Sequence, residues 1–180
     1  MLVRKLIGEK CYLSPYDVSY SEIFYRWVND LDVVSSISLA NKTISFEVEK
    51  EIMSKLSKEH SYLIVDKVDD KVIGGCGFFD IDHINRTSLV GIIIGDKNKW
   101  DKGFATDALK TLCAFGFNYL NLHNIMLTVY SFNKRAIRCY EKVGFKIIGR
   151  RRQSFYQNGI YHDELYMDII SDEFKNLWNI

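Results

Sequence analysis

The stretch Trp100–Leu109, with the sequence WDKGFATDAL, decides the fold of this chain. It follows an aliphatic run, Val90–Ile94, and leads into a segment, Thr106–Tyr119, whose apolar residues recur at helical spacing. The expected buried stripe of this helix is Ala108, Leu109, Leu112, Phe115 and Tyr119. A strand, a loop with glycine and a helix start form an anion cradle, because N–H groups of the first helical turn lack intrahelical partners. Gly103 and Ala105 let an anion such as a pyrophosphate approach the main chain closely. On spacing alone, an ordinary strand–helix connection fits equally well.

A second segment, Asn133–Phe145 with the sequence NKRAIRCYEKVGF, follows another strand-like run, Ile125–Tyr130. Asparagine is a good N-cap, and Gly144 stands where a C-cap glycine belongs. Four residues between these ends share one helical face: Ala136, Ile137, Tyr140 and Val143. This spacing predicts a second helix that packs on the sheet.

Together, the two segments resemble motifs of the GNAT N-acetyltransferases, which use acyl-CoA. The first is similar to the family's pyrophosphate-binding pattern Gln/Arg-x-x-Gly-x-Gly/Ala, matched by Gly103 and Ala105. The second is similar to its Asn-x-x-Ala-x-x-x-Tyr-x-x-x-Gly-Phe motif. Trp100, where many members have glutamine or arginine, is the variant usual in the RimJ/RimL-like branch. Arg26–Asp30 and Gly149–Asp163 also resemble that branch, so the resemblance covers nearly the whole chain.

Length and composition favour one well-buried domain over residues 1–180, because 47% of the residues are hydrophobic. The 24 Lys and Arg against 23 Asp and Glu leave a net charge of +1, so we expect neither nucleic-acid nor membrane binding. No apolar segment approaches a signal peptide or a membrane span. Four scattered cysteines lack metal-binding spacing: Cys11, Cys76, Cys113 and Cys139. We therefore expect no metal, buried free thiols and a cytoplasmic location.

The order of the expected elements predicts a mixed α/β sheet in a single domain. The expected strands are Cys11–Ser14, Ser61–Asp66, Lys71–Phe79, Ser88–Ile94, Ile125–Tyr130, Phe145–Ile148 and Glu164–Ile169. The expected helices are Tyr20–Asn29, Ser45–Ser57, Thr106–Tyr119 and the one within Asn133–Phe145, and Ile81–Arg86 is expected to be a connection. Three antiparallel strands followed by strand–helix–strand–helix–strand predict a mostly antiparallel sheet flanked by helices. The GNAT resemblance implies the same order.

The resemblance also implies acetyl-CoA as the acyl donor and the residues that contact it. The pyrophosphate would be bound by the loop and helix start, namely Trp100, Asp101, Lys102, Gly103, Phe104, Ala105 and Thr106. The pantetheine arm would lie along Ile92, Ile93 and Ile94, whose backbone N–H groups would polarise the thioester. Asn133 can cap its helix, contact the cofactor or do both. Gly91 in the strand indicates a bulge or a close approach.

Tyr140 is the expected catalytic residue, since it matches the family tyrosine that stabilises or protonates the departing thiolate of CoA. A phenol has a pKa of about 10 and a thiol about 8.5, so full proton transfer is uphill by roughly 2 kcal/mol. A strong hydrogen bond to the developing thiolate is therefore the expected role. Without the motif, Tyr140 would be an aromatic residue on the core face of its helix.

The acceptor amine must lose a proton before it attacks, because an amine of pKa near 10 is neutral in only about one molecule in a thousand at pH 7. Many GNAT enzymes have a glutamate on the strand for this purpose, but here the nearby positions are Ser88, Leu89 and Val90. Other candidates are Asp80, Asp82, His83, His162 and Asp163. The sequence leaves the general base unassigned.

The resemblance suggests Trp27, Asn29 and Asp30 for the acceptor side, although Trp27 also fits a core position. We expect acetyl transfer from acetyl-CoA to a primary amine by direct attack in a ternary complex. The acceptor stays open between a protein N-terminus, a polyamine, an aminoglycoside and another small amine. A non-catalytic acyl-CoA-binding module of the same fold is the alternative, and a homodimer is one option for the assembly.

Overall fold

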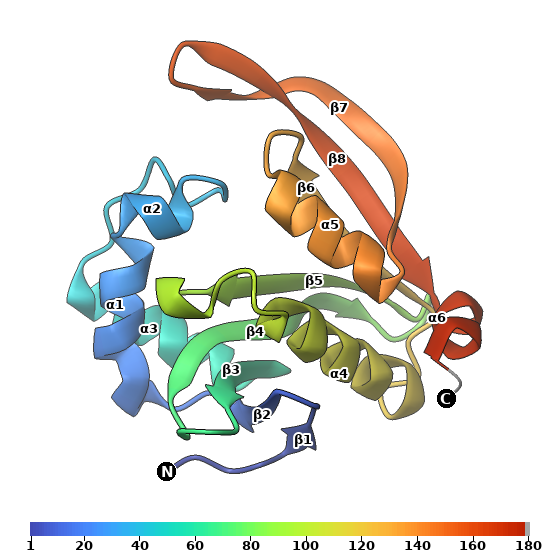
Figure 1. Ribbon diagram of the computed structural model, residues 1–180, viewed down its shortest axis with the longest axis horizontal. Coiled ribbons are helices and arrows are strands. Elements are labelled where there is room, and N and C mark those ends of the chain that lie inside the picture. Colours follow the sequence, from blue (N-terminus) through green and yellow to red (C-terminus); the bar gives the residue numbers. More distant parts are fainter. Residues whose placement is uncertain (179–180) are drawn as a thin grey trace.

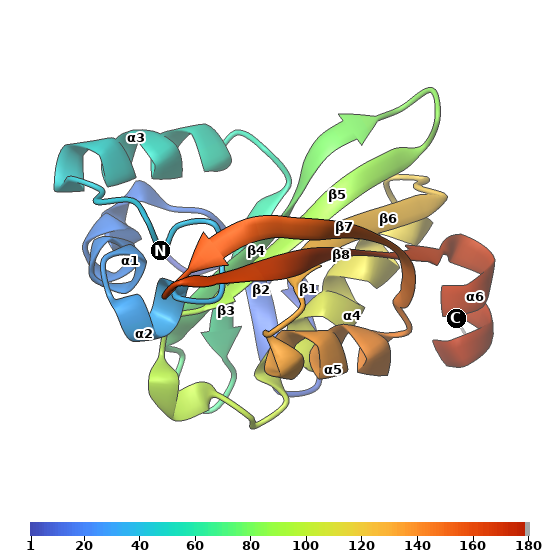
Figure 2. The same ribbon diagram turned by 90° about the horizontal axis from the view of Figure 1, so that it is seen from above.

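The computed structural model places one mixed sheet between two groups of helices (Figures 1 and 2). It describes residues 1–178, with side chains described up to residue 175, so residues 179–180 of the expected domain lie outside the description. Within residues 1–178, eight strands form a single sheet in the order β1-β2-β3-β4-β5-β6-β8-β7.

The strands and helices have the following bounds. The strands are β1 (Leu6–Ile7), β2 (Cys11–Pro15), β3 (Ser61–Asp66), β4 (Val72–Asp82), β5 (Thr87–Ile94), β6 (Asn124–Tyr130), β7 (Lys146–Gln157) and β8 (Ile160–Ile170). The α-helices are α1 (Ser21–Val28), α2 (Leu31–Val34), α3 (Phe46–Leu56), α4 (Phe104–Asn118), α5 (Lys134–Val143) and α6 (Ser171–Trp178). Two short 3-10 helices are η1 (Val18–Tyr20) and η2 (Lys97–Lys99).

Every expected strand and helix is present, and the mixed, mostly antiparallel sheet is confirmed. The connection expected at Ile81–Arg86 is wrong at its start, because β4 runs on to Asp82. The pairing of β4 with β5 shifts register between Phe79 and Asp82, and Asp80 has a φ of 51°. This bulge interrupts the alternation by which a strand is recognised in a sequence.

The closing strands β7 and β8 are longer than the sequence predicted, with 12 and 11 residues. Most of β7 is exposed and polar, so it lacks the buried apolar alternation of the inner strands. β1 and α2 were not predicted either, since two and four residues are too short to show a period. The helix α6 was also missed.

The parallel pair β5 and β6 opens in the middle of the sheet. All other neighbouring strands pair antiparallel, whereas β5 and β6 pair parallel from Thr87 to Leu89 against Asn124 to Met126. Within the described chain this pairing ends at Leu89, although β5 continues to Ile94 and β6 to Tyr130. The far halves of the two strands therefore leave backbone edges that are not paired with each other.

Two cores cover the two faces of the sheet. Neighbouring residues of a strand point to opposite faces, so Ile64 belongs to the core under α4 and α5 while Leu63 belongs to the core with α1 and α3. In the first core, the buried stripe predicted for α4 is confirmed at Ala108, Leu109 and Leu112. Tyr119 was wrongly expected in that stripe and is 79% exposed, because it follows the last residue of α4 and stacks on Phe115 at the surface.

Three single features of the fold also bear on the sequence predictions. All four cysteines are free thiols, and Cys139 alone among them is not fully buried. Gly91 marks a close approach and not a bulge, because a Cβ at this position would lie 2.9 Å from the ring of Phe79. No helix within residues 1–178 is long and apolar enough to cross a membrane.

Candidate active site

The start of α4 has the geometry of an anion cradle. Gly103 is the N-cap residue with a φ of 84°, in the left-handed region that favours glycine, and no side chain of a described residue caps the helix. The backbone N–H groups of Phe104, Ala105 and Thr106 precede the first intrahelical hydrogen bond, which Asp107 donates to Gly103 at 3.0 Å. With the helix dipole, these groups favour a negatively charged ligand at this end.

Asp107 anchors this helix start, a role that the sequence reasoning missed. Its buried carboxylate accepts the backbone N–H groups of Glu9, Lys10 and Cys11 at 2.8, 2.9 and 3.0 Å. Burial alone would raise the pKa of Asp107, but these three donors hold the pKa below its usual value. The sequence did contain one indication of this role, because an acidic residue in the first turn of a helix is favoured near the helix N-terminus. The carboxylate therefore ties the cradle to β2.

An open cavity of about 190 Å³ lies at the start of α4, between β5 and α5. It brings together the predicted cofactor residues Ile92, Ile93, Ile94, Trp100, Asp101, Gly103, Phe104, Ala105, Thr106 and Asn133, and the predicted catalytic Tyr140. Lys102 is the exception, because its exposed side chain does not line the cavity. Residues from distant segments thus meet where β5 and β6 separate.

The cavity also has a basic wall that the sequence analysis did not single out. Arg135, Arg138 and Lys142 of α5 all line it. Their spacing of three and four residues places them on one face of the helix, which was the signal in the sequence. The opposite side of the cavity includes Val33 and Ile37, from α2 and the loop after it.

Trp100 links the end of β5 to this basic wall. Its indole Nε1–H donates a hydrogen bond to the carbonyl oxygen of Ile94 at 2.8 Å. The guanidinium carbon of Arg135 lies 3.9 Å from the centroid of the Trp100 ring, a close cation–π contact. Trp100 therefore holds Arg135 at the cavity while it closes the end of the strand.

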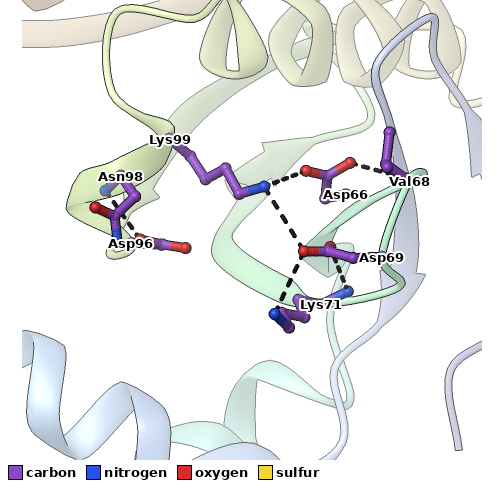
Figure 3. Close-up of polar contacts among 7 residues, drawn as sticks. All are labelled: Asp66, Val68, Asp69, Lys71, Asp96, Asn98 and Lys99. Carbon is purple, nitrogen blue, oxygen red and sulfur yellow. Dashed lines mark hydrogen bonds and ion pairs between the residues drawn. The ribbon is translucent and has the colours of Figure 1, made fainter.

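Lys99 lines the same cavity but its charge is already engaged (Figure 3). Its Nζ lies 2.5 Å from the buried carboxylate of Asp66 and 3.8 Å from Asp69, which also pairs with Lys71 at 3.5 Å. The pKa of Lys99 is raised, mainly by the hydrogen bond to Asp66. This network joins η2 to the turn between β3 and β4, so Lys99 supports the loop before the cradle.

Tyr140 and Asn133 occupy the α5 side of the cavity. Burial raises the pKa of Tyr140, so its phenol stays protonated and can donate a hydrogen bond. The side chain of Asn133 accepts the N–H of Ala136 at 3.1 Å, which confirms the predicted N-cap. Its amide donates to the carbonyl of Ser36 at 3.4 Å and so joins α5 to the loop after α2.

The residues expected on the acceptor side do not line the cavity. Trp27 is 9% exposed in the second core. The side-chain amide of Asn29 donates to the carbonyl of Ile44 at 2.9 Å, and Asp30 accepts the N–H of Asp32 at 3.0 Å and pairs with Lys97 at 2.9 Å. These contacts position α1 and α2, and an acceptor contact by Trp27, Asn29 or Asp30 stays a prediction.

The candidate bases of the sequence analysis also lie away from the cavity. Asp82 accepts the N–H groups of Ile84 and Asn85 in a turn, both at 2.8 Å. Asp163 pairs with Arg150 at 3.3 Å, and the ring of His162 packs on Phe132 with centroids 4.5 Å apart. Asp101 is the one carboxylate among the described residues that line the cavity, and it is exposed.

The hairpin of β7 and β8 reaches across to the N-terminal helices (Figure 2). Near its tip, the side-chain amide of Gln157 donates to the carbonyl oxygen of Ser35 at 2.9 Å. Tyr156 and Tyr161 of the same hairpin pack on each other, and each is 61% exposed. The tip of the hairpin therefore contacts the loop after α2.

Comparison with known proteins decides the family. Residues 12–146 match the family described as "Acetyltransferase (GNAT) domain". The chain belongs to the GNAT acetyltransferases. The match spans three quarters of this acetyltransferase and includes the cradle and the whole of α5. The predicted family and the predicted enzyme class are confirmed.

Named relatives of this acetyltransferase include two spermidine N(1)-acetyltransferases. That of Escherichia coli K12 is 29% identical over 157 residues, which cover 83% of this chain and 82% of the relative. That of Vibrio cholerae is 30% identical over 134 residues, covering 73% and 77%. An uncharacterized N-acetyltransferase of Bacillus licheniformis, p20, is 26% identical over 174 residues, covering 94% and 97%.

Solved structures share the fold of this acetyltransferase. The Vibrio cholerae spermidine N-acetyltransferase in complex with CoA and spermine superposes with a TM-score of 0.80 at 25% identity, covering 92% of this chain and 98% of that one. A GNAT-family acetyltransferase of Bacillus anthracis has a TM-score of 0.82 at 20% identity, covering 93% and 99%. The second likeness concerns the fold alone.

Proposed function

We propose that this acetyltransferase moves the acetyl group of acetyl-CoA to a primary amine by direct attack in a ternary complex. The observation that carries the proposal is the single cavity at which the cradle of α4, the unpaired edge of β5 and Tyr140 meet. Each of the three matches one physical requirement of the reaction.

The first requirement is a site for the phosphates of CoA. The uncapped N–H groups at the start of α4 suit the pyrophosphate, and the left-handed φ of Gly103 lets it approach the backbone. Arg135, Arg138 and Lys142 add positive charge beside the cradle. The side chain of Lys102 is exposed outside the cavity, so its contact with the phosphates stays a prediction.

The second requirement is a track for the pantetheine arm. Beyond Leu89, the edge of β5 that turns toward β6 has no partner from β6 in the described chain. An extended amide chain can bind there as an additional strand. Gly95 donates its N–H to Ile73 of β4, so the backbone of Ile93 faces β4 as well, and the groups at the free edge belong to Ile92 and Ile94. The carbonyl of Ile94 already accepts the indole N–H of Trp100. N–H groups at this edge would also polarise the thioester carbonyl as the amine attacks.

The third requirement is stabilisation of the leaving thiolate. Tyr140 lines the cavity, and its raised pKa makes it a hydrogen-bond donor that keeps its proton. We assign it the role of donating a hydrogen bond to the sulfur of CoA as the C–S bond breaks. The sulfur then gains its proton from the newly acetylated nitrogen.

For the acceptor, the names of the Escherichia coli and Vibrio cholerae relatives favour a polyamine over the other primary amines. A protein N-terminus remains the second candidate, because Trp100 supports membership of the RimJ/RimL-like branch. The buried free thiols support a reducing cytoplasmic location. Assembly into a homodimer stays a prediction.

The test is release of free CoA thiol from acetyl-CoA with a panel of amines that contains spermidine, an aminoglycoside and peptides with free N-termini. We expect turnover with at least one amine, and a loss of roughly 100-fold in kcat for Tyr140→Phe. Tyr119→Phe is the matched control, because that tyrosine is exposed at the far end of α4. Binding of acetyl-CoA without turnover of any amine would instead identify a non-catalytic module.

A further inference from the structure

Glu49 is a buried carboxylate that the site described above does not use. It lies on α3 and is 3% exposed, and no described residue forms a hydrogen bond or ion pair with its carboxylate. Its neighbour Glu47 is exposed and pairs with Lys50 at 3.7 Å. Met53, one turn further along the same face, is fully buried in the second core. Burying an unpaired carboxylate is unfavourable, so such a group is a candidate for function.

Tyr16 is a second polar side chain that packs against this core. The hydroxyl of Tyr16 occupies the space above Gly75, where an added Cβ would lie 2.1 Å from the hydroxyl oxygen. Its ring packs against Phe24 with centroids 5.5 Å apart. Burial, together with the nearby Cys76 and Glu49, raises the pKa of Tyr16. The helix α3, which carries Glu49, packs against η1 shortly after Tyr16 and against α1, so Glu49 and Tyr16 border the same core.

The Tyr16 hydroxyl stands beside the strand that lines the cavity. Gly75 of β4 pairs in register with Ile93 of β5, and cross-strand partners have neighbouring side-chain positions on the same face. Ile92 and Ile94 pack into the core under α4 and α5, whereas Ile93 packs into the core with Tyr16. Tyr16 and Glu49 thus approach β5 from the face opposite the cradle.

This opposite face is where an acceptor amine has to arrive. If acetyl-CoA occupies the cavity beside α4 and α5, those helices and the cofactor cover that side of the thioester. The loop after α2 borders the cavity itself, and the hairpin contacts this loop through Gln157 and Ser35. The other face of β5 packs through Ile93 into the core that contains α1. Glu49 and Tyr16 belong to this side through α3 and the segment after β2.

We propose that Tyr16 and Glu49 form the path by which the acceptor amine loses its proton, a proposal that rests on the proposed function. The ammonium passes one proton to the Tyr16 oxygen while Tyr16 passes its own proton through a water molecule to the Glu49 carboxylate. The neutral nitrogen then forms the C–N bond, the C–S bond breaks, and the second nitrogen proton goes to the CoA sulfur. Glu49 returns its proton to solvent before the next cycle.

The electrostatics agree with this assignment. Burial raises the pKa of Glu49 to about 7, where a carboxylate is an effective base at neutral pH. The elements packed against α3 present Glu22, Tyr25 and Arg26 from α1 and Tyr20 from η1. Glu22 and Arg26 pair with each other at 2.6 Å on the surface, so neither forms an ion pair with Glu49.

The test compares Glu49→Gln with Glu47→Gln, an exposed glutamate on the same helix. With saturating acetyl-CoA and an amine from the panel, wild-type kcat should rise with pH and level off above about pH 7. Glu49→Gln should lower kcat by roughly 100-fold at pH 7, remove that inflection and regain activity toward pH 9. Glu47→Gln should behave as wild type, acetyl-CoA affinity should be unchanged in both variants, and the Tm of Glu49→Gln should not lie below that of wild type at pH 7.

Tyr16→Phe keeps the packing and removes only the hydroxyl, so it tests the path independently of Glu49. It should lower kcat similarly, and the double variant should be no slower than either single one, because both residues serve one path. Unchanged kcat and pH inflection in Glu49→Gln or in Tyr16→Phe would overturn the path while leaving the proposed function intact. No turnover of any amine by the wild type would overturn the proposed function and the path with it.

Discussion

The carboxylate of Asp107 accepts the backbone N–H of Cys11 at 3.0 Å and so joins the first turn of α4 to β2 across 96 positions of the chain. The same carboxylate accepts two further N–H groups, from Glu9 and Lys10. One buried side chain thereby positions the helix start that we assign to the pyrophosphate. The precision of the cradle depends on a residue that does not line it.

Asp107→Asn should destabilise the protein by about 1–3 kcal/mol. The amide nitrogen that replaces one carboxylate oxygen would face backbone N–H groups, which are also donors, so at least one hydrogen bond would be lost. The pKa of Asp107 is lowered in the fold, so its stabilisation is present above the unfolded pKa and is lost as pH falls through the folded pKa. Denaturant titrations should therefore show the difference from wild type at pH 7 and a smaller one below about pH 4. Asp101→Asn, on the exposed loop before the cradle, serves as the control and should be nearly neutral. An equal effect of both substitutions would contradict the anchoring role.

Gly103→Val should abolish detectable acetyl-CoA binding while lowering stability by only about 1–2 kcal/mol. The side chain would fill the approach to the first-turn N–H groups, and the φ of 84° is strained for any residue with a Cβ. Gly159→Val is the matched control, because Gly159 has a φ of 79° in the hairpin turn and open space around it. Millimolar acetyl-CoA should no longer raise the Tm of Gly103→Val but should still raise the Tm of Gly159→Val. A parallel loss in both variants would return the loop to a purely structural role.

Arg135→Ala should weaken acetyl-CoA binding by roughly 10-fold, and the loss should shrink at high salt, since a charge near phosphate is screened. The structural reason is the 3.9 Å contact that holds the guanidinium over Trp100 at the cavity wall. Lys134→Ala removes an exposed neighbouring charge that does not line the cavity, so its effect should be small. Calorimetric titration at two salt concentrations measures both, and equal effects would mean that only overall charge matters.

Glu49 should make the free energy of unfolding depend on pH. Its pKa is raised to about 7 in the fold, from 4.5, so the folded state holds the proton more tightly and stability falls as pH rises between these values. We expect a fall of about 2 kcal/mol, less than the full shift implies because solvent screens part of it. Glu49→Gln should remove this fall, which urea titrations from pH 4.5 to 8 can measure. If the free energy of unfolding changes with pH in the same way in wild type and in Glu49→Gln, the buried, unpaired state of Glu49 is contradicted.

Local sequence patterns were sufficient for much of the cradle and its two helices. A left-handed glycine, an N-cap asparagine and a C-cap glycine act on the backbone within a few residues, so Gly103, Asn133 and Gly144 could be read directly. Apolar spacing likewise predicted the buried stripe of α4 up to Leu112. Apolar spacing failed at Tyr119, because the pattern continues past the end of α4. It also failed in β7, because that strand is mostly exposed to solvent.

Contacts between distant segments could not be predicted in this way. The Trp100–Arg135 stack, the Asp107 anchor and the Lys99–Asp66 pair each join segments that are at least 33 positions apart. Nothing in the residues near Trp27, Asn29 and Asp30 distinguished helix positioning from acceptor binding. Glu49 stood in the sequence as one of three glutamates spaced two apart, and only the packing of α3 turns it inward.

The sequence by itself determined the part of the site that we assign to the donor: the cradle, the strand before it and the helix with Tyr140. Capping, φ preference and periodicity are properties of short segments. The tertiary structure decided the part that we assign to the acceptor. The separation of β5 from β6 beyond Leu89, and the burial of Glu49, arise from how whole strands and helices pack. Burial and strand divergence depend on residues far apart in the chain, so no local pattern carries them.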